Sequence, residues 1–125
     1  MSCDQQRLGD YLAHILEAIE RIDRYTEDMD EVAFLGNSLV QDAVVRNLEI
    51  IGEASNNIGK HYREFVVAHP ELPLAFAYQM RNAVAHGYFT ADFEIVWKTI
   101  HRDLPTFYVA VRRSAESSPS SGTPD

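Results

Sequence analysis

The sequence predicts an all-α fold, an antiparallel bundle of about five helices. Apolar residues recur at the three- and four-residue spacing of amphipathic helices through most of the chain. No segment sustains the two-residue alternation of a half-buried strand. A chain of 125 residues, 46% of them apolar, can form one compact domain and is too short for two ordinary ones.

Residues 6–30 form the first amphipathic segment, because their apolar residues share one helical face and most charged residues lie opposite. Asp30 can then cap a short helix over residues 31–35, and Gly36 can end it. The apolar face of the first segment consists of Leu8, Tyr11, Leu12, Ile15, Leu16, Ile19, Ile22 and Tyr25.

A second long helix is expected over residues 38–60, with Ser38 as its N-cap and Gly59 as its C-terminal stop. Gly52 lies inside this helix, where glycine costs about 1 kcal/mol relative to alanine. Either a close approach of two helices requires Gly52, or it is a tolerated surface glycine, and the sequence leaves both open. The apolar stripe of this helix contains Leu39, Val40, Ala43, Val44, Leu48, Ile51, Ala54 and Ile58.

Prolines and glycines divide the next part of the chain into shorter helices. Residues 61–69 are expected to form one or two helical turns. Pro73 is placed as the first residue of a following helix over residues 74–86, and Gly87 ends that helix.

Two further helices are expected near the C-terminus. Asp92 can cap a helix over residues 93–104, and a final helix follows Pro105. The helical domain is expected to occupy residues 1–113. Residues 114–125 are rich in Ser and Pro and poor in apolar groups, so they are expected to form a disordered tail.

The composition limits the kinds of partner. A net charge of −8 counts against a protein that holds long nucleic acid through its overall field, so any nucleic acid must be gripped locally or across an interface between subunits. No apolar run of about 18 residues predicts a membrane helix, and the N-terminus lacks the features of a secretory signal. With Cys3 as the single cysteine, no intrachain disulfide can form, and the expected location is the cytoplasm.

No cofactor or metal is expected. The sequence has no Gly-rich phosphate loop, no Rossmann fingerprint and no cysteine cluster. Asp42, Arg46, Glu49 and Glu53 repeat at helical spacing, which is typical of a solvated or salt-bridged face. Arg46 and Glu53 could also line a groove at a dimer interface.

The segment MRNAVAHGYF, residues 80–89, concentrates the side chains best suited to chemistry. Arg81 and His86 are five residues apart, which on a regular helix is a rotation of about 140°, so they would not share a face. Gly87 indicates that the helix ends at His86. The last turn can then unwind and bring His86 toward Arg81, with Tyr88 following in the loop.

These side chains suit the cleavage of an RNA phosphodiester without a metal. His86 can take the proton of a ribose 2′-hydroxyl or give one to the leaving 5′-oxygen, and Arg81 can neutralise charge on the phosphoryl oxygens. Asn82 can orient either partner, and Tyr88 can bind phosphate or stack on a base. One histidine cannot easily be acid and base at once, so a symmetric homodimer would supply both. The alternative is structural: Arg81 would be a surface arginine, and His86 would cap the carbonyls at the end of its helix.

The spacing Arg81, four residues, His86, one residue, Tyr88 resembles the motif of the HepT-like branch of the HEPN (higher eukaryotes and prokaryotes nucleotide-binding) superfamily. Asn82 also fits, because a polar residue after the arginine is usual there. The resemblance extends over four blocks in the same order, YLAHILEAIERIDRYT, QDAVVRNLEIIGEASNNI, HPELPLAFAYQMRNAVAHGYF and WKTIHRDLP.

This resemblance implies the toxin of a type VII-like toxin–antitoxin pair. Such toxins are dimeric, HEPN-like, metal-independent endoribonucleases that act on RNA such as tRNA or mRNA. Arg81 and His86 would be the catalytic residues, supported by Asn82 and Tyr88. The implied partner is a minimal nucleotidyltransferase antitoxin that transfers AMP onto Tyr88. The alternative is a non-catalytic binding module that presents Tyr88 to such a partner, which the acidic charge favours.

Overall fold

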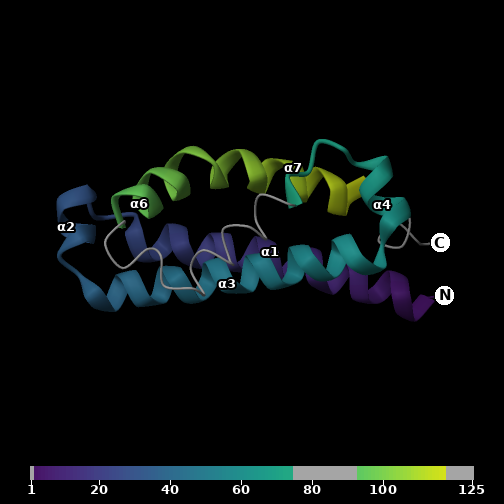
Figure 1. Ribbon diagram of the computed structural model, residues 1–125, viewed down its shortest axis with the longest axis horizontal. Coiled ribbons are helices and arrows are strands. Elements are labelled where there is room, and N and C mark those ends of the chain that lie inside the picture. The colour runs from purple at the N-terminus through teal and green to yellow at the C-terminus, as the bar shows by residue number, and fades with distance from the viewer. Residues whose placement is uncertain (1, 75–92, 118–125) are drawn as a thin grey trace.

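The computed structural model describes residues 2–74 and 93–117, and these residues form two layers of helices (Figure 1). In one layer α1 and α3 lie side by side in opposite directions, joined at one end by the short α2. In the other layer α6 and α7 follow one another, and α4 lies at the end of the bundle that holds the N-terminus. The helices are α1 (Ser2–Thr26), α2 (Glu31–Leu35), α3 (Ser38–His61), α4 (Arg63–Ala68), α6 (Phe93–Arg102) and α7 (Leu104–Ser117).

The all-α class is confirmed, since the described ranges contain helices and no strand. None of the helices in these ranges is long and apolar enough to cross a membrane.

The apolar face predicted for α1 is confirmed except at its last member. Its central residues are buried, with Ile15 fully enclosed, whereas Tyr25 is 39% exposed. Thr26 takes the buried position next to Tyr25, and its hydroxyl donates to the carbonyl of Ile22 at 2.8 Å. The last turn of α1 therefore buries a threonine whose polar group is satisfied within the helix.

The short helix α2 closes one end of the bundle. Asp30 caps it as predicted, because its side chain accepts from the backbone N–H of Ala33 at 2.9 Å, and Gly36 is its C-cap. The buried Phe34 ring lies 5.2 Å from the Trp97 ring of α6. Stacking between these large aromatic groups ties α2 to the second layer.

The predicted ends of α3 are both wrong. Asn37, not Ser38, is the N-cap, because its side-chain oxygen accepts from the backbone N–H of Val40 at 3.0 Å. At the other end α3 continues through Gly59 to His61 and leaves the helical conformation at Tyr62. The chain turns there directly into α4 without a left-handed residue, so no glycine is required.

Gly52 is buried in α3, so the interpretation of a tolerated surface glycine is wrong. The predicted apolar stripe is confirmed at Val44, Leu48 and Ile51, but Leu39 is 79% exposed. Leu39 lies in the first turn of α3, where the neighbouring Val40 and not Leu39 packs against the core.

The junction between α6 and α7 is tighter than predicted. Only Asp103 separates them, and α7 begins before Pro105 rather than after it. A proline fits the first turn of a helix, where the backbone N–H has no intrahelical acceptor. α7 continues past residue 113 with Ser114 buried, and the tail predicted for the remaining residues, 118–125, lies outside the described ranges.

Candidate functional site

The predicted site residues Arg81, Asn82, His86 and Tyr88 lie outside the described residues. The described residues on either side of residues 75–92 belong to the core. Leu72 and Leu74 are each 7% exposed, and Phe93 packs against the buried cluster. The Phe93 ring makes an edge contact with Phe34, with ring centroids 6.0 Å apart. The described residues that flank the motif segment are therefore fixed by core packing.

The buried surface of α3 contains polar groups. Asn47 is 4% exposed and Ser55 is 1% exposed. The side-chain nitrogen of Asn47 donates to the carbonyl of Ala43 at 2.9 Å, but Asn47 Oδ1 and Ser55 Oγ have no hydrogen-bond partner among the described residues. A buried unsatisfied polar atom costs about 1–3 kcal/mol, so packing alone does not explain why α3 carries these side chains.

A hollow of about 250 Å³ lies along the α1–α3 seam. Arg46 and Glu53 of α3 line it together, facing His14 of α1. Arg46 also forms an ion pair with Glu49 at 3.9 Å, with 72% of the Arg46 side chain exposed, so the pair contributes at most about 1 kcal/mol. The salt-bridged interpretation of this face is thus confirmed, and the dimer groove stays a prediction. The full lining is Tyr11, His14, Arg46, Ile50, Glu53, Ala54 and Asn57.

A serine, a histidine and a glutamate meet where α7 packs near the end of α4. Nδ1 of His69 lies 3.3 Å from a carboxylate oxygen of Glu71 and 3.4 Å from the hydroxyl of Ser114. A backbone hydrogen bond lowers the pKa of the Glu71 carboxyl, desolvation partly opposes this, and His69 lowers the pKa further. In a catalytic relay the two ring nitrogens serve different partners, whereas here both partners share Nδ1. The geometry is that of a packing contact.

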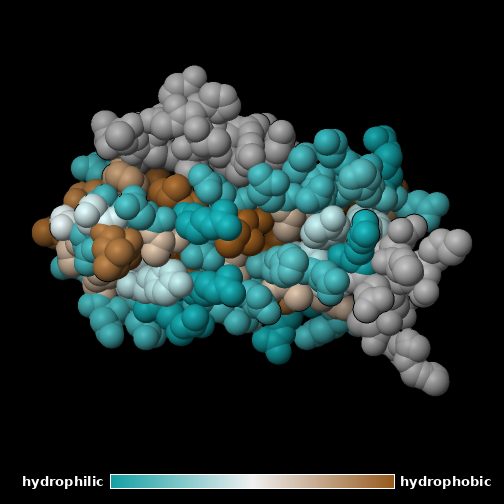
Figure 2. Space-filling view, turned by 90° about the horizontal axis from the view of Figure 1, so that it is seen from below, coloured by the Kyte–Doolittle hydropathy of each residue, from teal (hydrophilic) through white to brown (hydrophobic). Residues whose placement is uncertain are grey.

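Apolar side chains are exposed at the end of the bundle that carries α2. Val32 and Leu39 are each 79% exposed, and Leu35 is 39% exposed. Figure 2 shows hydrophobic residues gathered at that end of the face and mostly hydrophilic residues elsewhere on it. Such a surface suits contact with another chain rather than chemistry.

Comparisons with known proteins point to one family. Residues 15–114 match the family described as ribonuclease HepT-like. "Probable ribonuclease HepT" of Thermococcus cleftensis is 42% identical over 97 residues, which cover 78% of this chain and 86% of that protein. A protein of Methanocaldococcus jannaschii named "Putative RNase" is 37% identical over 95 residues, which cover 76% of this chain and 84% of that protein. The comparison with solved structures gives no significant match.

Proposed function

Because the chain belongs to the HepT-like ribonuclease family, we propose that it is a metal-independent endoribonuclease. The observation that carries this proposal is that the family match over residues 15–114 includes the segment with Arg81 and His86. A relative that shares 42% of the aligned residues and bears the ribonuclease name supports the same activity.

In this mechanism His86 moves protons and Arg81 stabilises charge. His86 removes the proton of the ribose 2′-hydroxyl, which attacks the adjacent phosphorus, and His86 of a second copy protonates the leaving 5′-oxygen. Arg81 neutralises the negative charge that grows on the phosphoryl oxygens, while Asn82 and Tyr88 orient the phosphate. The products are a 2′,3′-cyclic phosphate and a 5′-hydroxyl. The proposal therefore includes a homodimer, and a stable monomer near 14.2 kDa in light scattering would contradict it.

The test is cleavage of total RNA by the purified protein in EDTA. We expect products with 5′-hydroxyl ends, and we expect His86→Ala and Arg81→Ala each to lower the rate by at least about 10²-fold with an unchanged melting temperature. His101→Ala is the matched control, because His101 is an exposed histidine whose ring packs on Trp97 in α6. Products with 5′-phosphate ends, or loss of all activity in EDTA, would exclude this mechanism.

We further propose that the protein is the toxin of a type VII-like pair in the cytoplasm, acting on tRNA or mRNA and controlled by a nucleotidyltransferase antitoxin. Transfer of AMP to Tyr88 would place a phosphodiester charge beside His86, where it can pair with Arg81 and occupy the substrate position. Co-expression with a neighbouring nucleotidyltransferase should add AMP to the wild type and none to Tyr88→Phe. AMP mapped to Tyr62 or Tyr78 in mass spectrometry would show that control acts elsewhere.

A second candidate is a non-catalytic module that only presents Tyr88 to the nucleotidyltransferase. The net charge of −8 favours it, because the overall field repels RNA. Expression of the chain alone separates the two functions. A ribonuclease toxin arrests growth and His86→Ala abolishes the arrest, whereas a binding module leaves growth unchanged in both cases.

A further inference from the structure

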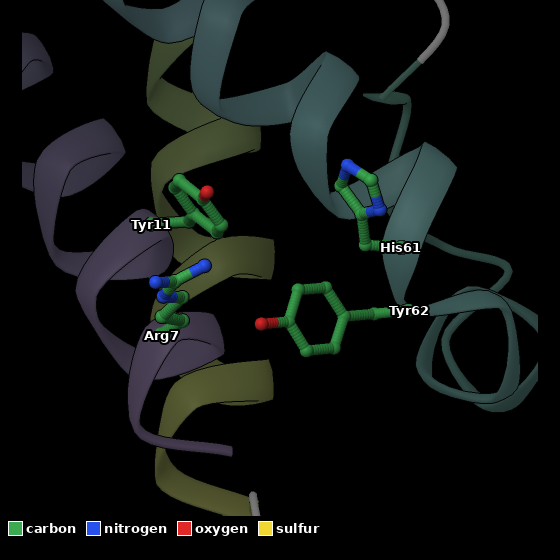
Figure 3. A pocket seen from close by; sticks show the side chains of 4 residues that line it. All are labelled: Arg7, Tyr11, His61 and Tyr62. Carbon is green, nitrogen blue, oxygen red and sulfur yellow. The ribbon is translucent and has the colours of Figure 1, made fainter. Parts of the chain in front are cut away.

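A second hollow of about 250 Å³, here called the Arg7 hollow, lies where α1 begins and α3 ends (Figure 3). Arg7 and Tyr11 reach into it from α1, and His61 and Tyr62 line it from the end of α3. Figure 3 shows the Tyr62 ring pointing across the hollow, with its oxygen directed toward α1. The rings of Tyr11 and Tyr62 meet edge to face, with centroids 6.3 Å apart and planes at 69°.

Among the residues that the structure describes, the lining of this hollow offers hydrogen-bond donors and no carboxylate. The chain has 19 acidic residues, yet the four side chains here are an arginine, a histidine and two tyrosines. In the sequence, His61 and Tyr62 are flanked by the exposed Lys60 and Arg63, and the exposed Glu64 follows. A guanidinium with hydroxyl and imidazole donors is the chemistry that binds phosphate. The described lining therefore suits an anion, although the overall charge of the protein is negative.

Helix stability alone does not explain this set of residues. Lys60 and His61 lie in the last turn of α3, where cations offset the partial negative charge of the helix end. That effect does not account for Arg7, which comes from the other wall of the hollow near the start of α1. Nor does it account for two half-buried tyrosines beside a cation, a combination that binds a phosphate together with a planar base.

This hollow adjoins the one beside Arg46. Tyr11 lines both, so the two are neighbours on the α1–α3 seam. The hollow beside Arg46 also contains His14, Glu53 and Asn57, and the amide of Asn57 can bond to the edge of a base. Two adjacent polar hollows with a cation in each fit a strand of several nucleotides better than a single small anion.

We infer that the Arg7 hollow holds one nucleotide of single-stranded RNA, with its phosphate on Arg7 and its base against Tyr11 and Tyr62. The strand then continues along the seam toward Arg46. This inference rests on the proposed ribonuclease function and supplies the local grip that an acidic ribonuclease needs. Each such phosphate contact adds about 0.7 to the slope of log affinity against log salt for a single strand.

The test uses the full chain carrying His86→Ala, so that RNA is not cut, and a short fluorescein-labelled single-stranded RNA. We expect Arg7→Ala to weaken binding, measured by fluorescence anisotropy, at least about fivefold and to lower the salt slope by about 0.7. Arg24→Ala is the matched control, because it removes the same charge from an exposed position at the far end of α1. It should leave both quantities nearly unchanged.

Two substitutions of Tyr11 distinguish stacking on an RNA base from packing within the protein. Tyr11→Phe keeps the ring and should retain binding, whereas Tyr11→Leu keeps apolar volume without a ring face and should lose about fivefold or more. Equal binding by wild type, Arg7→Ala and Tyr11→Leu would overturn the inference while leaving the ribonuclease proposal intact. No RNA binding by the parent protein would overturn both.

A competition experiment distinguishes a nucleotide of an RNA strand from a free mononucleotide. AMP added at concentrations up to the millimolar range should displace the labelled RNA only weakly, because a single nucleotide engages one of the two hollows. Displacement by AMP at the concentration at which unlabelled RNA competes would show a mononucleotide site and overturn the assignment to an RNA strand.

Discussion

α1 and α3 are nearly equal in length, with 25 and 24 residues, and they pack against each other, yet they bury different surfaces. The buried face of α1 is apolar up to its last residue, Thr26, whose hydroxyl is bonded within the helix. The buried face of α3 includes Asn47, Gly52 and Ser55, with two polar atoms unpartnered among the described residues. Replacing an unpartnered buried polar atom by an apolar group of the same shape can be nearly neutral in stability. Packing thus accounts for the buried face of α1, whereas it does not account for the two unpartnered polar atoms of α3.

The largest loss of stability is expected for a substitution in the core face of α1. Ile15 of α1 is fully buried, so Ile15→Ala removes most of an apolar side chain from the core and should lower the free energy of unfolding by about 2–5 kcal/mol. Urea denaturation followed by circular dichroism measures it. Ala13→Gly, at an exposed position of the same helix, is the control and should cost only about 1 kcal/mol. Similar losses for the two variants would mean that α1 is not the packing helix of this pair.

The two glycines of α3 sharpen the comparison. Gly52 is buried, so Gly52→Leu must force a side chain into occupied space and should destabilise the protein by about 1–3 kcal/mol. Gly59 is exposed, and a Cβ added there meets nothing within 4 Å. Gly59→Leu should therefore stabilise α3 by up to about 1 kcal/mol through helix propensity. Thermal denaturation measures both variants. Equal shifts of the melting temperature in the same direction would show that position 52 does not require a small residue.

Substitution of Asn37, and not of Ser38, should destabilise the N-terminus of α3. Asn37→Ala removes the side-chain oxygen that accepts from the backbone N–H of Val40 and should cost about 1 kcal/mol. Ser38→Ala, its neighbour inside the helix, should change the free energy of unfolding by less than about 0.5 kcal/mol. The reverse order in chemical denaturation would restore Ser38 as the cap.

Amphipathic spacing is enough to predict α1 and the all-α class, because the core faces follow directly from the helical period. The cap of α3 could not be predicted, since Asn37 and Ser38 are adjacent residues that both cap well, and only the extended backbone of Asn37, with φ −123° and ψ 93°, decides between them. The exposure of Leu39 depends on which side of the first turn of α3 meets the core, and the apolar stripe, which contains both Leu39 and Val40, does not decide this.

The candidate site divides in the same way. Arg81, His86 and Tyr88 can be found from a short spacing within one segment, but their arrangement lies outside the described residues. The two hollows on the seam could not be found from the sequence, because they depend on the register of α1 against α3. Arg7 and His61 are far apart in the chain and share a lining only after that packing is fixed.

The smallest expected effect tests the polar surface of α3 directly. Ser55 is 1% exposed, and its hydroxyl has no hydrogen-bond partner among the described residues. Ser55→Ala removes a buried unsatisfied group and introduces a better helix former, so the free energy of unfolding should stay level or rise by up to about 1 kcal/mol. Thr26→Val is the matched control on α1, because its hydroxyl is satisfied by the carbonyl of Ile22, and its loss should cost up to about 1 kcal/mol.

Opposite signs for these two variants in thermal denaturation would establish that α3 carries Ser55 at the expense of stability. RNA cleavage measured on the same Ser55→Ala protein then gives the reason. A slower rate in an equally or more stable protein means that the hydroxyl acts on the substrate or on the segment that carries Arg81 and His86. An unchanged rate, or a loss of stability beyond about 1 kcal/mol, means that Ser55 is an ordinary satisfied core residue and that the contrast between the two helices is one of packing alone.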